Sequence, residues 1–293
     1  MRNSFFKGHG LGNDYLVLDP RELSFRITPR AVRALCDRHT GLGADGVLAL
    51  APSRVADFGV RIYNPDGSEA EKSGNGLRIL ARALHALHRT RRTHFCVETR
   101  GGVVEIGLEV DARGDAHRVR VAMGRASFRP AALPCTLAVP ELVDRSIRVG
   151  GRALRFTGVS VGNPHCVIFR RRGGAWSQRE LRELGPRLET HPWFPRRTNV
   201  QLARARGPHA LDVRVWERGA GETRSSGSSA CAAACAGVRL GLVASPVRVH
   251  MPGGSLRVDV SADFGVTLEG PVAEIARGRL ADCFVRMLGR RRA

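Results

Sequence analysis

One stretch of this chain occurs twice, and the repeat limits the possible folds more than any other feature. Val60–Asn64 (VRIYN) is matched 153 residues later by Val213–Glu217 (VRVWE). Each copy leads to a Ser-Gly pair at the same offset, Ser73-Gly74 in the first and Ser226-Gly227 in the second, and an apolar run follows. A fixed offset of this kind is typical of duplicated structural units. The repeat therefore predicts two structurally similar halves.

Two further landmarks keep nearly the same spacing. Gly12-Asn13 matches Gly162-Asn163 at an offset of 150 residues, and Val97–Gly102 resembles Val249–Gly254 at an offset of 152. The predicted fold class is α/β, of the α+β type, with two similar domains related by internal duplication. We place the N-terminal half at residues 1–125 plus about 276–293, and the C-terminal half at residues 126–275.

The two Ser-Gly pairs have the composition of helix starts. In each copy, small capping residues follow a β-type run and precede an apolar run, which marks a helix N-terminus. The unpaired N–H groups there favour a carboxylate. A plain strand-to-helix connection is the alternative for one such turn. Because the turn occurs twice, we favour a small-molecule site shared between the halves, at a domain interface.

Several motifs, in order and over nearly the whole chain, resemble those of the diaminopimelate epimerases. They are His9–Asp14, Gly43–Gly46, Asn64–Glu71, Ser73–Gly76, Gly162–His165, Thr198–Val200 and Glu217–Thr223. The resemblance implies a cytoplasmic, homodimeric amino-acid epimerase that needs no cofactor and no metal, with its active site in the cleft between two related halves. It implies interconversion of LL- and meso-diaminopimelate, a precursor of lysine and peptidoglycan, by two-base proton transfer at the α-carbon.

The same resemblance assigns roles to individual residues. The acid/base positions are Ser73 and Ser226, and His165 and Glu217 are further catalytic residues. The backbone of Gly74-Asn75 and Gly227-Ser228 receives the substrate α-carboxylate. The implied substrate-binding residues are Asn13, Asn64, Gly74, Asn75, Asn163, Asn199, Glu217, Arg218, Gly227 and Ser228.

The chain departs from the family pattern at both acid/base positions, where the resemblance implies cysteine and this sequence has Ser73 and Ser226. Ser229 also stands where the family usually has glycine. An aliphatic hydroxyl ionises on the order of 7 pKa units above a thiol, a cost of roughly 10 kcal/mol. A helix N-terminus offsets only about 1–2 kcal/mol of that cost. The substitution preserves substrate contacts but weakens proton abstraction.

Three hypotheses remain open from the sequence: a working but impaired epimerase, a non-catalytic amino-acid-binding relative, and a basic nucleic-acid-binding protein. The net charge of +20 permits the third. However, the basic residues form only short clusters, and aromatic residues, which would stack on bases, make up 5% of the chain. We therefore favour arginines spread over solvated faces, and a small amino acid rather than nucleic acid as the partner.

Cysteine usage and hydropathy favour a cytoplasmic protein. The seven cysteines are scattered and include no Cys-x-x-Cys pair, which suits reduced thiols. The N-terminus turns polar too early for a signal peptide, and no apolar run reaches the length of a membrane span. Among the helices, we predict 29–37, 77–88 with one apolar and one basic face, and 178–184 ended by Gly185-Pro186.

Overall fold

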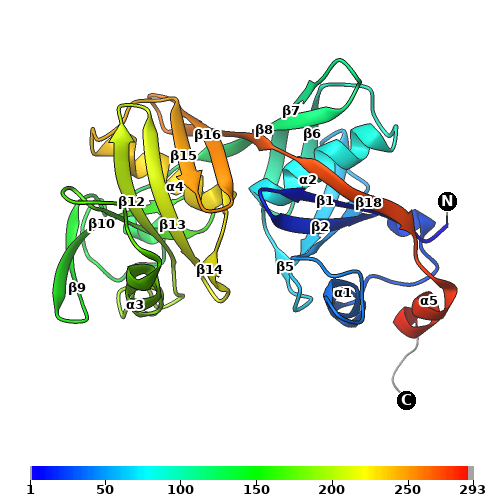
Figure 1. Ribbon diagram of the computed structural model, residues 1–293, viewed down its shortest axis with the longest axis horizontal. Helices are drawn as coiled ribbons and strands as arrows, with labels where there is room; N and C mark the ends of the chain where they lie inside the picture. Colours follow the sequence, from blue (N-terminus) through cyan, green and yellow to red (C-terminus); the bar gives the residue numbers. More distant parts are fainter. Residues whose placement is uncertain (1, 290–293) are drawn as a thin grey trace. The chain divides into compact units, whose positions relative to one another are not determined.

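The computed structural model describes residues 2–289. It divides into two compact units, Met1–Val121 with Gly270–Ala293 (the N-terminal unit) and Ala122–Glu269 (the C-terminal unit). Each unit combines strands with a few helices, and Figure 1 shows both. The basic residues 290–293, which we included in the first half, lie outside the described residues.

The N-terminal unit is built on a mixed sheet. In order across the sheet, its strands are β18 (Ala273–Arg279), β1 (Ser4–Gly10), β2 (Asn13–Leu18), β3 (Val47–Ala51), β4 (Phe58–Tyr63), β6 (His94–Thr99), β7 (Gly102–Val110) and β8 (Ala116–Arg125). The pairs β2–β3 and β4–β6 are parallel and the others antiparallel. The helices are α1 (Pro29–Cys36), α2 (Gly74–Ala86) and α5 (Asp282–Gly289).

The C-terminal unit repeats this order. Its strands are β9 (Arg145–Val149), β10 (Arg152–Ser160), β11 (Pro164–Phe169), β12 (Asn199–Gly207), β13 (Ala210–Glu217), β15 (Val247–Met251), β16 (Gly254–Val260) and β17 (Gly265–Pro271). Its helices are α3 (Gln178–Glu189) and α4 (Gly227–Arg239). The parallel pairs β11–β12 and β13–β15 fall at the positions of β2–β3 and β4–β6.

The resemblance between the units extends to their short elements. A short strand, β5 (Glu69–Ala70), pairs with β4 and precedes α2, and β14 (Gly221–Thr223) pairs with β13 and precedes α4. Matching order, matching strand directions and matching helix positions confirm the predicted internal duplication. Short 3₁₀ helices occur at Pro20–Glu22 and Pro130–Ala132.

Helix α4 lies among the strands of its own unit, and this explains its composition. It contacts β10, β11, β12, β13, β15 and β16, so that strands surround it (Figure 1). Every residue from Ala230 to Ala236 is fully buried. A helix that is apolar all round is a buried helix, and only small side chains allow strands to approach it on every side. The Ala/Cys-rich sequence follows from that enclosure.

Helix α2 occupies the corresponding place in the N-terminal unit, where it contacts β1, β2, β7 and β18. Its apolar residues Leu77, Ile79 and Leu80 are fully buried, as the sequence predicts. Arg78 is an exception to the predicted spread of arginines over solvated faces, because it has no exposed surface. The surrounding strands leave this helix too little free surface to accommodate a basic face at that position.

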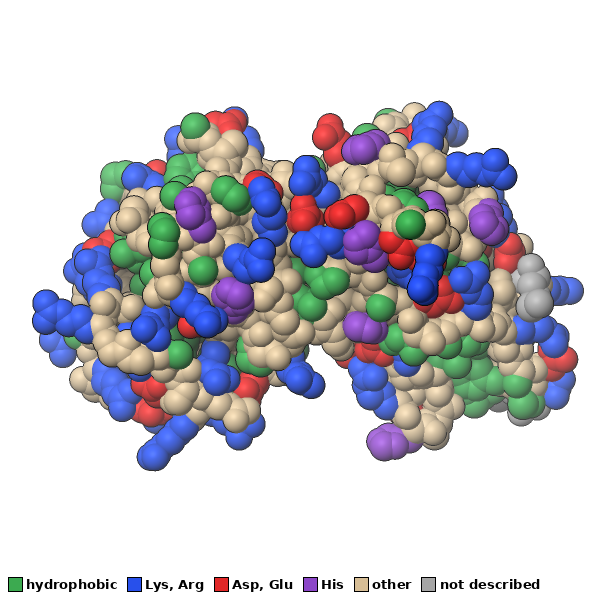
Figure 2. Space-filling view, turned by 45° about the horizontal axis from the view of Figure 1, so that its top comes forward, with side chains coloured by type: hydrophobic (Ala, Val, Ile, Leu, Met, Phe, Trp, Pro, Cys, Tyr) green, Lys and Arg blue, Asp and Glu red, His purple; other side chains and the backbone are tan. Residues whose placement is uncertain are grey.

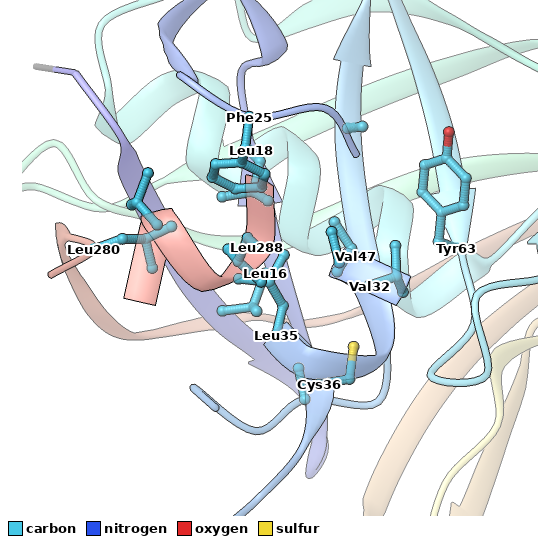
Figure 3. Packing of buried hydrophobic residues seen from close by; sticks show 14 residues of the cluster. Leu16, Leu18, Phe25, Val32, Leu35, Cys36, Val47, Tyr63, Leu280 and Leu288 are labelled. Carbon is cyan, nitrogen blue, oxygen red and sulfur yellow. The ribbon is translucent and has the colours of Figure 1, made fainter. Parts of the chain in front are cut away.

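The outer side of each sheet is covered by a further helix layer. In the N-terminal unit, α1 and α5 pack on β2 and β3, and Figure 3 shows Leu35 and Leu288 gathered around Leu16. In the C-terminal unit, α3 contributes Leu181, Leu184 and Leu188 to a cluster with strands β11 and β12. These layers hold the strands whose ends carry the candidate site.

Helix α3 is longer than predicted, because it continues through Gly185-Pro186 to Glu189. Its start is fixed by a capping box between Ser177 and Glu180. At Gly185 an added Cβ would lie 2.7 Å from the Trp216 ring, so this glycine permits close packing instead of ending the helix. Burial of Leu188 at 0% exposure offsets the backbone hydrogen bond that Pro186 removes.

Basic side chains are dispersed over the face shown in Figure 2, where acidic and uncharged groups separate them. Many are ion-paired, such as Arg61 with Glu69 and Arg38 with Asp45. Among residues 2–289, no helix is both long enough and apolar enough to cross a membrane.

Candidate active site

Ser73 stands at the N-terminus of α2, one residue before Gly74. Its backbone is extended, and its Oγ accepts a hydrogen bond from the N–H of Gly76 at 3.0 Å. The hydroxyl of Tyr15, on β2, lies 3.3 Å from the same Oγ. Ser73 is half-buried, whereas Gly74 and Asn75 are buried. The predicted helix start is confirmed, and the helix begins earlier than Leu77.

Ser226 holds the corresponding position before Gly227 in the C-terminal unit. Its backbone angles, φ −145° and ψ 123°, are close to those of Ser73, φ −141° and ψ 114°. Unlike Ser73, it makes no side-chain capping hydrogen bond to α4. The neighbouring Ser225 is buried, and its Oγ has no hydrogen-bond partner among the described residues. The two serines thus have the same backbone setting but different hydroxyl environments.

Two of the predicted substrate-binding residues of the N-terminal unit contact one another. Asn75 Nδ2 donates to Asn13 Oδ1 at 3.1 Å. On its other side Asn75 Oδ1 accepts from the guanidinium of Arg78, which also donates to the carbonyl of Pro271 at 2.8 Å. Because Arg78 is wholly buried, its guanidinium has no access to solvent, and its hydrogen bond fixes the orientation of the Asn75 side chain.

Asn13 is also held from the opposite side, by the Gly43–Gly46 turn. Its Nδ2 donates to Asp45 Oδ2 at 2.9 Å. Arg38 bridges Asp45 and Asp14, at 2.7 and 2.8 Å. Burial alone would raise the pKa of Asp14, but the hydrogen bonds and charges of Arg38 and Lys7 outweigh it and lower that pKa. The Asp14 carboxylate therefore stays ionised and fixes the turn that presents Asn13.

Asn64 lies in the turn that follows β4. Its Nδ2 donates to Ser68 Oγ at 3.0 Å, and its carbonyl accepts from Gly67 N at 2.9 Å. These bonds keep Asn64 within its own turn and do not join it to Asn13 or Asn75. Its predicted contact with substrate remains a prediction.

In the C-terminal unit the predicted polar residues gather at the ends of neighbouring strands. Asn163 precedes β11 and His165 is its second residue. In the sheet, His165 lies opposite Asn199, the first residue of β12, and Val200 lies opposite Trp216. Glu217 ends β13, and Arg218 follows it. Strand register therefore places all of these positions at one edge of the sheet.

His165 sits in the middle of a buried chain of hydrogen bonds. Gln201 Nε2 lies 3.0 Å from His165 Nδ1 and also donates to Ser229 Oγ at 2.9 Å. On the other side, His165 Nε2 lies 2.9 Å from Asn163 Oδ1. Complete burial, aided by the charge of Arg218, lowers the pKa of His165 to about 3. The ring is consequently neutral near pH 7.

Asn199 connects two of these strand ends. Its Oδ1 accepts from the backbone N–H of Arg218 at 3.0 Å, and its Nδ2 donates to the carbonyl of Pro164 at 2.9 Å. Buried Glu189 accepts from Gly219 N at 2.8 Å. Together these bonds fix the turn that carries Glu217 and Arg218, and they leave one N–H of Asn199 for another acceptor.

The sequence has matches among known proteins. A model of the diaminopimelate epimerase family matches residues 5–129 and 157–274. A diaminopimelate epimerase 2 from Nostoc sp. is 41% identical over 280 residues, which cover 94% of this chain and 95% of that protein. The chain belongs to the diaminopimelate epimerase family. It is accordingly an enzyme of the epimerase, or isomerase, class.

Other similarities agree with this membership. A diaminopimelate epimerase from Desulforudis audaxviator is 42% identical over 279 residues, covering 94% of this chain and 98% of that protein. A hydroxyproline epimerase structure from Agrobacterium vitis aligns with a TM-score of 0.70 at 16% identity, over 94% of this chain and 91% of that one. A predicted epimerase from Pseudomonas aeruginosa aligns at 0.67 with 21% identity, over 95% and 99%. These structures share the two-domain fold.

The buried cysteines of this family member are poor proton acceptors. Burial raises the pKa of Cys36 and of Cys235 to about 12. Cys231, five residues past Ser226, is fully buried in α4. Within residues 2–289, no group of three or more His, Cys, Asp and Glu side chains is placed to hold a metal ion.

Three residues that touch the predicted site were not identified from the sequence. Tyr15, Arg78 and Gln201 each hydrogen-bond a predicted site residue. Arg78 and Gln201 could have been recognised from the sequence, because each is a strongly polar residue inside an otherwise apolar run. Tyr15 carried none, since tyrosine is common in strands.

Proposed function

We propose that this protein interconverts LL- and meso-diaminopimelate by removing the α-proton from one face of the substrate and returning a proton to the other, without a bound cofactor. Ser73 and Ser226, one from each unit, occupy the acid/base positions. The supporting observation is that each serine directly precedes the first turn of a central helix, in nearly the same backbone conformation. Sequence relatives of the same family support the substrate.

The backbone N–H groups of Gly74-Asn75 and Gly227-Ser228 receive the α-carboxylate in this proposal. Free N–H groups at a helix start bind carboxylates and stabilise the negative charge that develops when the α-proton leaves. Asn13, Asn64, Asn163, Asn199, Glu217 and Arg218 hold the remaining polar groups of the substrate. The neutral ring of His165 assists by fixing the side chain of Asn163, and Glu217 assists from the adjacent strand end.

Serine at both positions makes a slow enzyme, because a hydroxyl ionises far less readily than a thiol. For this reason a second function has a specific observation in its favour. A chain with intact ligand-holding asparagines and two weak bases is suited to bind an amino acid without converting it.

We also propose, on the family resemblance, that the protein is a homodimer located in the cytoplasm. Sedimentation velocity tests the dimer, and cell fractionation tests the location.

The deciding experiment measures both binding and proton exchange with the unmodified chain. Diaminopimelate is incubated in deuterium oxide, and α-deuterium and stereochemistry are followed by NMR, while calorimetry measures affinity. Incorporation of deuterium with inversion supports the epimerase. Tight binding without deuterium incorporation supports the binding relative, and absence of both overturns the proposal.

A further inference from the structure

The weak basicity of Ser73 raises the question of where its proton goes. A serine that accepts an α-proton must lose its own hydroxyl proton, either before that step or with it. Loss to bulk water leaves a free alkoxide, at a cost of roughly 10 kcal/mol relative to a thiolate. A neighbouring base of intermediate strength removes the need for a free alkoxide.

The hydrogen bonds around Ser73 Oγ specify where that base lies. The N–H of Gly76 donates to one lone pair of Oγ at 3.0 Å. A backbone N–H can only donate, so Ser73 Oγ is the acceptor in this hydrogen bond and the hydroxyl proton of Ser73 can point elsewhere. Tyr15 Oη, at 3.3 Å, is an oxygen that can accept it. One lone pair of Ser73 then remains for an incoming proton.

The Tyr15 ring is held in place by its packing. Tyr15 is 7% exposed and lies in the interior of β2, opposite Gly8 on β1. A Cβ added at Gly46 would lie 2.5 Å from Tyr15 Cε1, so the ring packs directly against the backbone of the Gly43–Gly46 turn. A ring fixed in this way keeps its hydroxyl directed at Ser73.

We propose that Tyr15 is the proton acceptor behind Ser73, so that the two residues form one acid/base unit. This inference rests on the proposed function. The Cα–H bond of the substrate breaks and its proton bonds to Ser73 Oγ. Tyr15 has first lost its phenolic proton to solvent. As the α-proton arrives, the Ser73 O–H bond breaks and that proton passes to the Tyr15 phenolate. The electron pair stays on the α-carbon, beside the α-carboxylate at the start of α2. The reverse transfer returns a proton.

Magnitudes favour this arrangement. A phenol ionises near pKa 10 and a cysteine thiol near 8.5, a gap of about 1.5 pKa units or roughly 2 kcal/mol. The corresponding gap for serine alone is on the order of 7 pKa units. A Ser–Tyr pair therefore offers a proton acceptor that is intermediate between a thiolate and a free serine alkoxide.

The arrangement is present in only one unit. The chain has two tyrosines, Tyr15 and Tyr63, and both lie in the N-terminal unit. Ser226 makes no side-chain capping bond and has no tyrosine in its own unit. The α-proton should therefore exchange faster in the stereoisomer that presents it to Ser73 than in the stereoisomer that presents it to Ser226.

The first test compares Tyr15→Phe with the matched control Tyr63→Phe, each of which removes one phenolic oxygen. We expect Tyr15→Phe to lower α-deuterium exchange at least 100-fold while the dissociation constant for diaminopimelate changes less than about threefold. The same exchange in the unmodified chain should increase with pH as the phenol ionises. Tyr63→Phe should leave the rate and the pH profile as they are. Exchange that survives in Tyr15→Phe overturns the role of Tyr15.

The second test remains decisive even if Tyr15→Phe folds poorly. In the Tyr63→Phe chain, biosynthetic incorporation of 3-fluorotyrosine replaces Tyr15 alone, and fluorine lowers the pKa of a phenol with little change in size. We expect the pH profile of exchange to move to lower pH by the same interval as the ultraviolet titration of Tyr15. A profile that does not move overturns the inference. If the unmodified chain exchanges no α-proton, the proposed function fails and Tyr15 loses its role with it.

Discussion

Gln201 Nε2 lies 3.0 Å from His165 Nδ1, so the orientation of the Gln201 amide is coupled to the tautomer of the ring. Because an amide N–H only donates, this orientation of Gln201 goes with an unprotonated Nδ1 and with the hydrogen on Nε2. Nε2 then donates to Asn163 Oδ1 at 2.9 Å. The NH₂ group of Asn163 is consequently turned away from the ring.

Acid should destabilise the protein through His165. Its folded pKa, lowered to about 3, lies below the unfolded value near 6.5, so the unfolded chain binds an extra proton between these pH values. Stability should therefore fall as pH decreases from about 6.5, by up to ~1.4 kcal/mol per pH unit. Urea unfolding of the parent chain and His165→Gln at pH 7 and pH 5 measures the difference. Equal losses in both chains contradict the prediction.

Ser229→Ala should cost about 1–3 kcal/mol of unfolding free energy, because it removes the acceptor of a buried Gln201 N–H. Ser228→Ala, the adjacent half-buried serine, is the matched control and should change stability by less than about 0.5 kcal/mol. Urea denaturation of both variants provides the comparison. Equal effects would show that the hydroxyl of Ser229 contributes nothing specific.

Arg78→Lys should weaken substrate binding even though the charge is kept. A lysine lacks the planar fork with which Arg78 donates to Asn75, to Pro271 and, at 3.4 Å, to Gly74. Once Asn75 is released, Asn13 loses a donor. We expect a 5- to 50-fold rise in the dissociation constant for diaminopimelate, measured by calorimetry. Arg82→Lys, on the same helix, should leave affinity within a factor of two, and a comparable loss there would assign the effect to general destabilisation.

Replacing Ser226 with Cys should increase proton exchange more than replacing Ser73 with Cys. A thiol supplies a far better base than a lone hydroxyl, and Ser226 is the serine without a tyrosine in its unit. For the stereoisomer that presents its α-proton to Ser226, we expect Ser226→Cys to increase exchange at least 100-fold. Ser73→Cys should give a smaller gain for the other stereoisomer. Deuterium exchange from each stereoisomer separately measures both gains, and the reverse order contradicts the prediction.

Much of the fold could be predicted because its signals are local. The two helix starts that follow Ser73 and Ser226 and the Ala/Cys-rich run of α4 depend on neighbours in sequence, and the repeat can be read directly from the sequence. The structure has each of them. The meeting of Asn13 with Asn75 did not follow from local signals, since 62 residues separate them. There the motif resemblance named the residues, and the sheet brought them together.

Other features required tertiary contacts that a sequence pattern does not display. Gly185-Pro186 is a typical helix-ending pair, yet here the helix continues and the glycine allows it to pack closely against Trp216. Arg78 departs from the general expectation that arginines lie on solvated faces, because its partners are buried carbonyl and amide oxygens. Gln201 lies within an apolar strand and acquires its role only through His165 and Ser229.

The enclosure of α4 limits how this enzyme can diversify. From Ala230 to Ala236 no position has free surface, so any larger side chain must push a strand aside. Ser226 and Gly227 therefore stand at the start of a helix in which almost no substitution is tolerated. Variation that re-tunes the reaction has to arise at the rim, in the residues before the helix and at the neighbouring strand ends. A directed-evolution library confined to those positions samples nearly all the freedom that the fold allows.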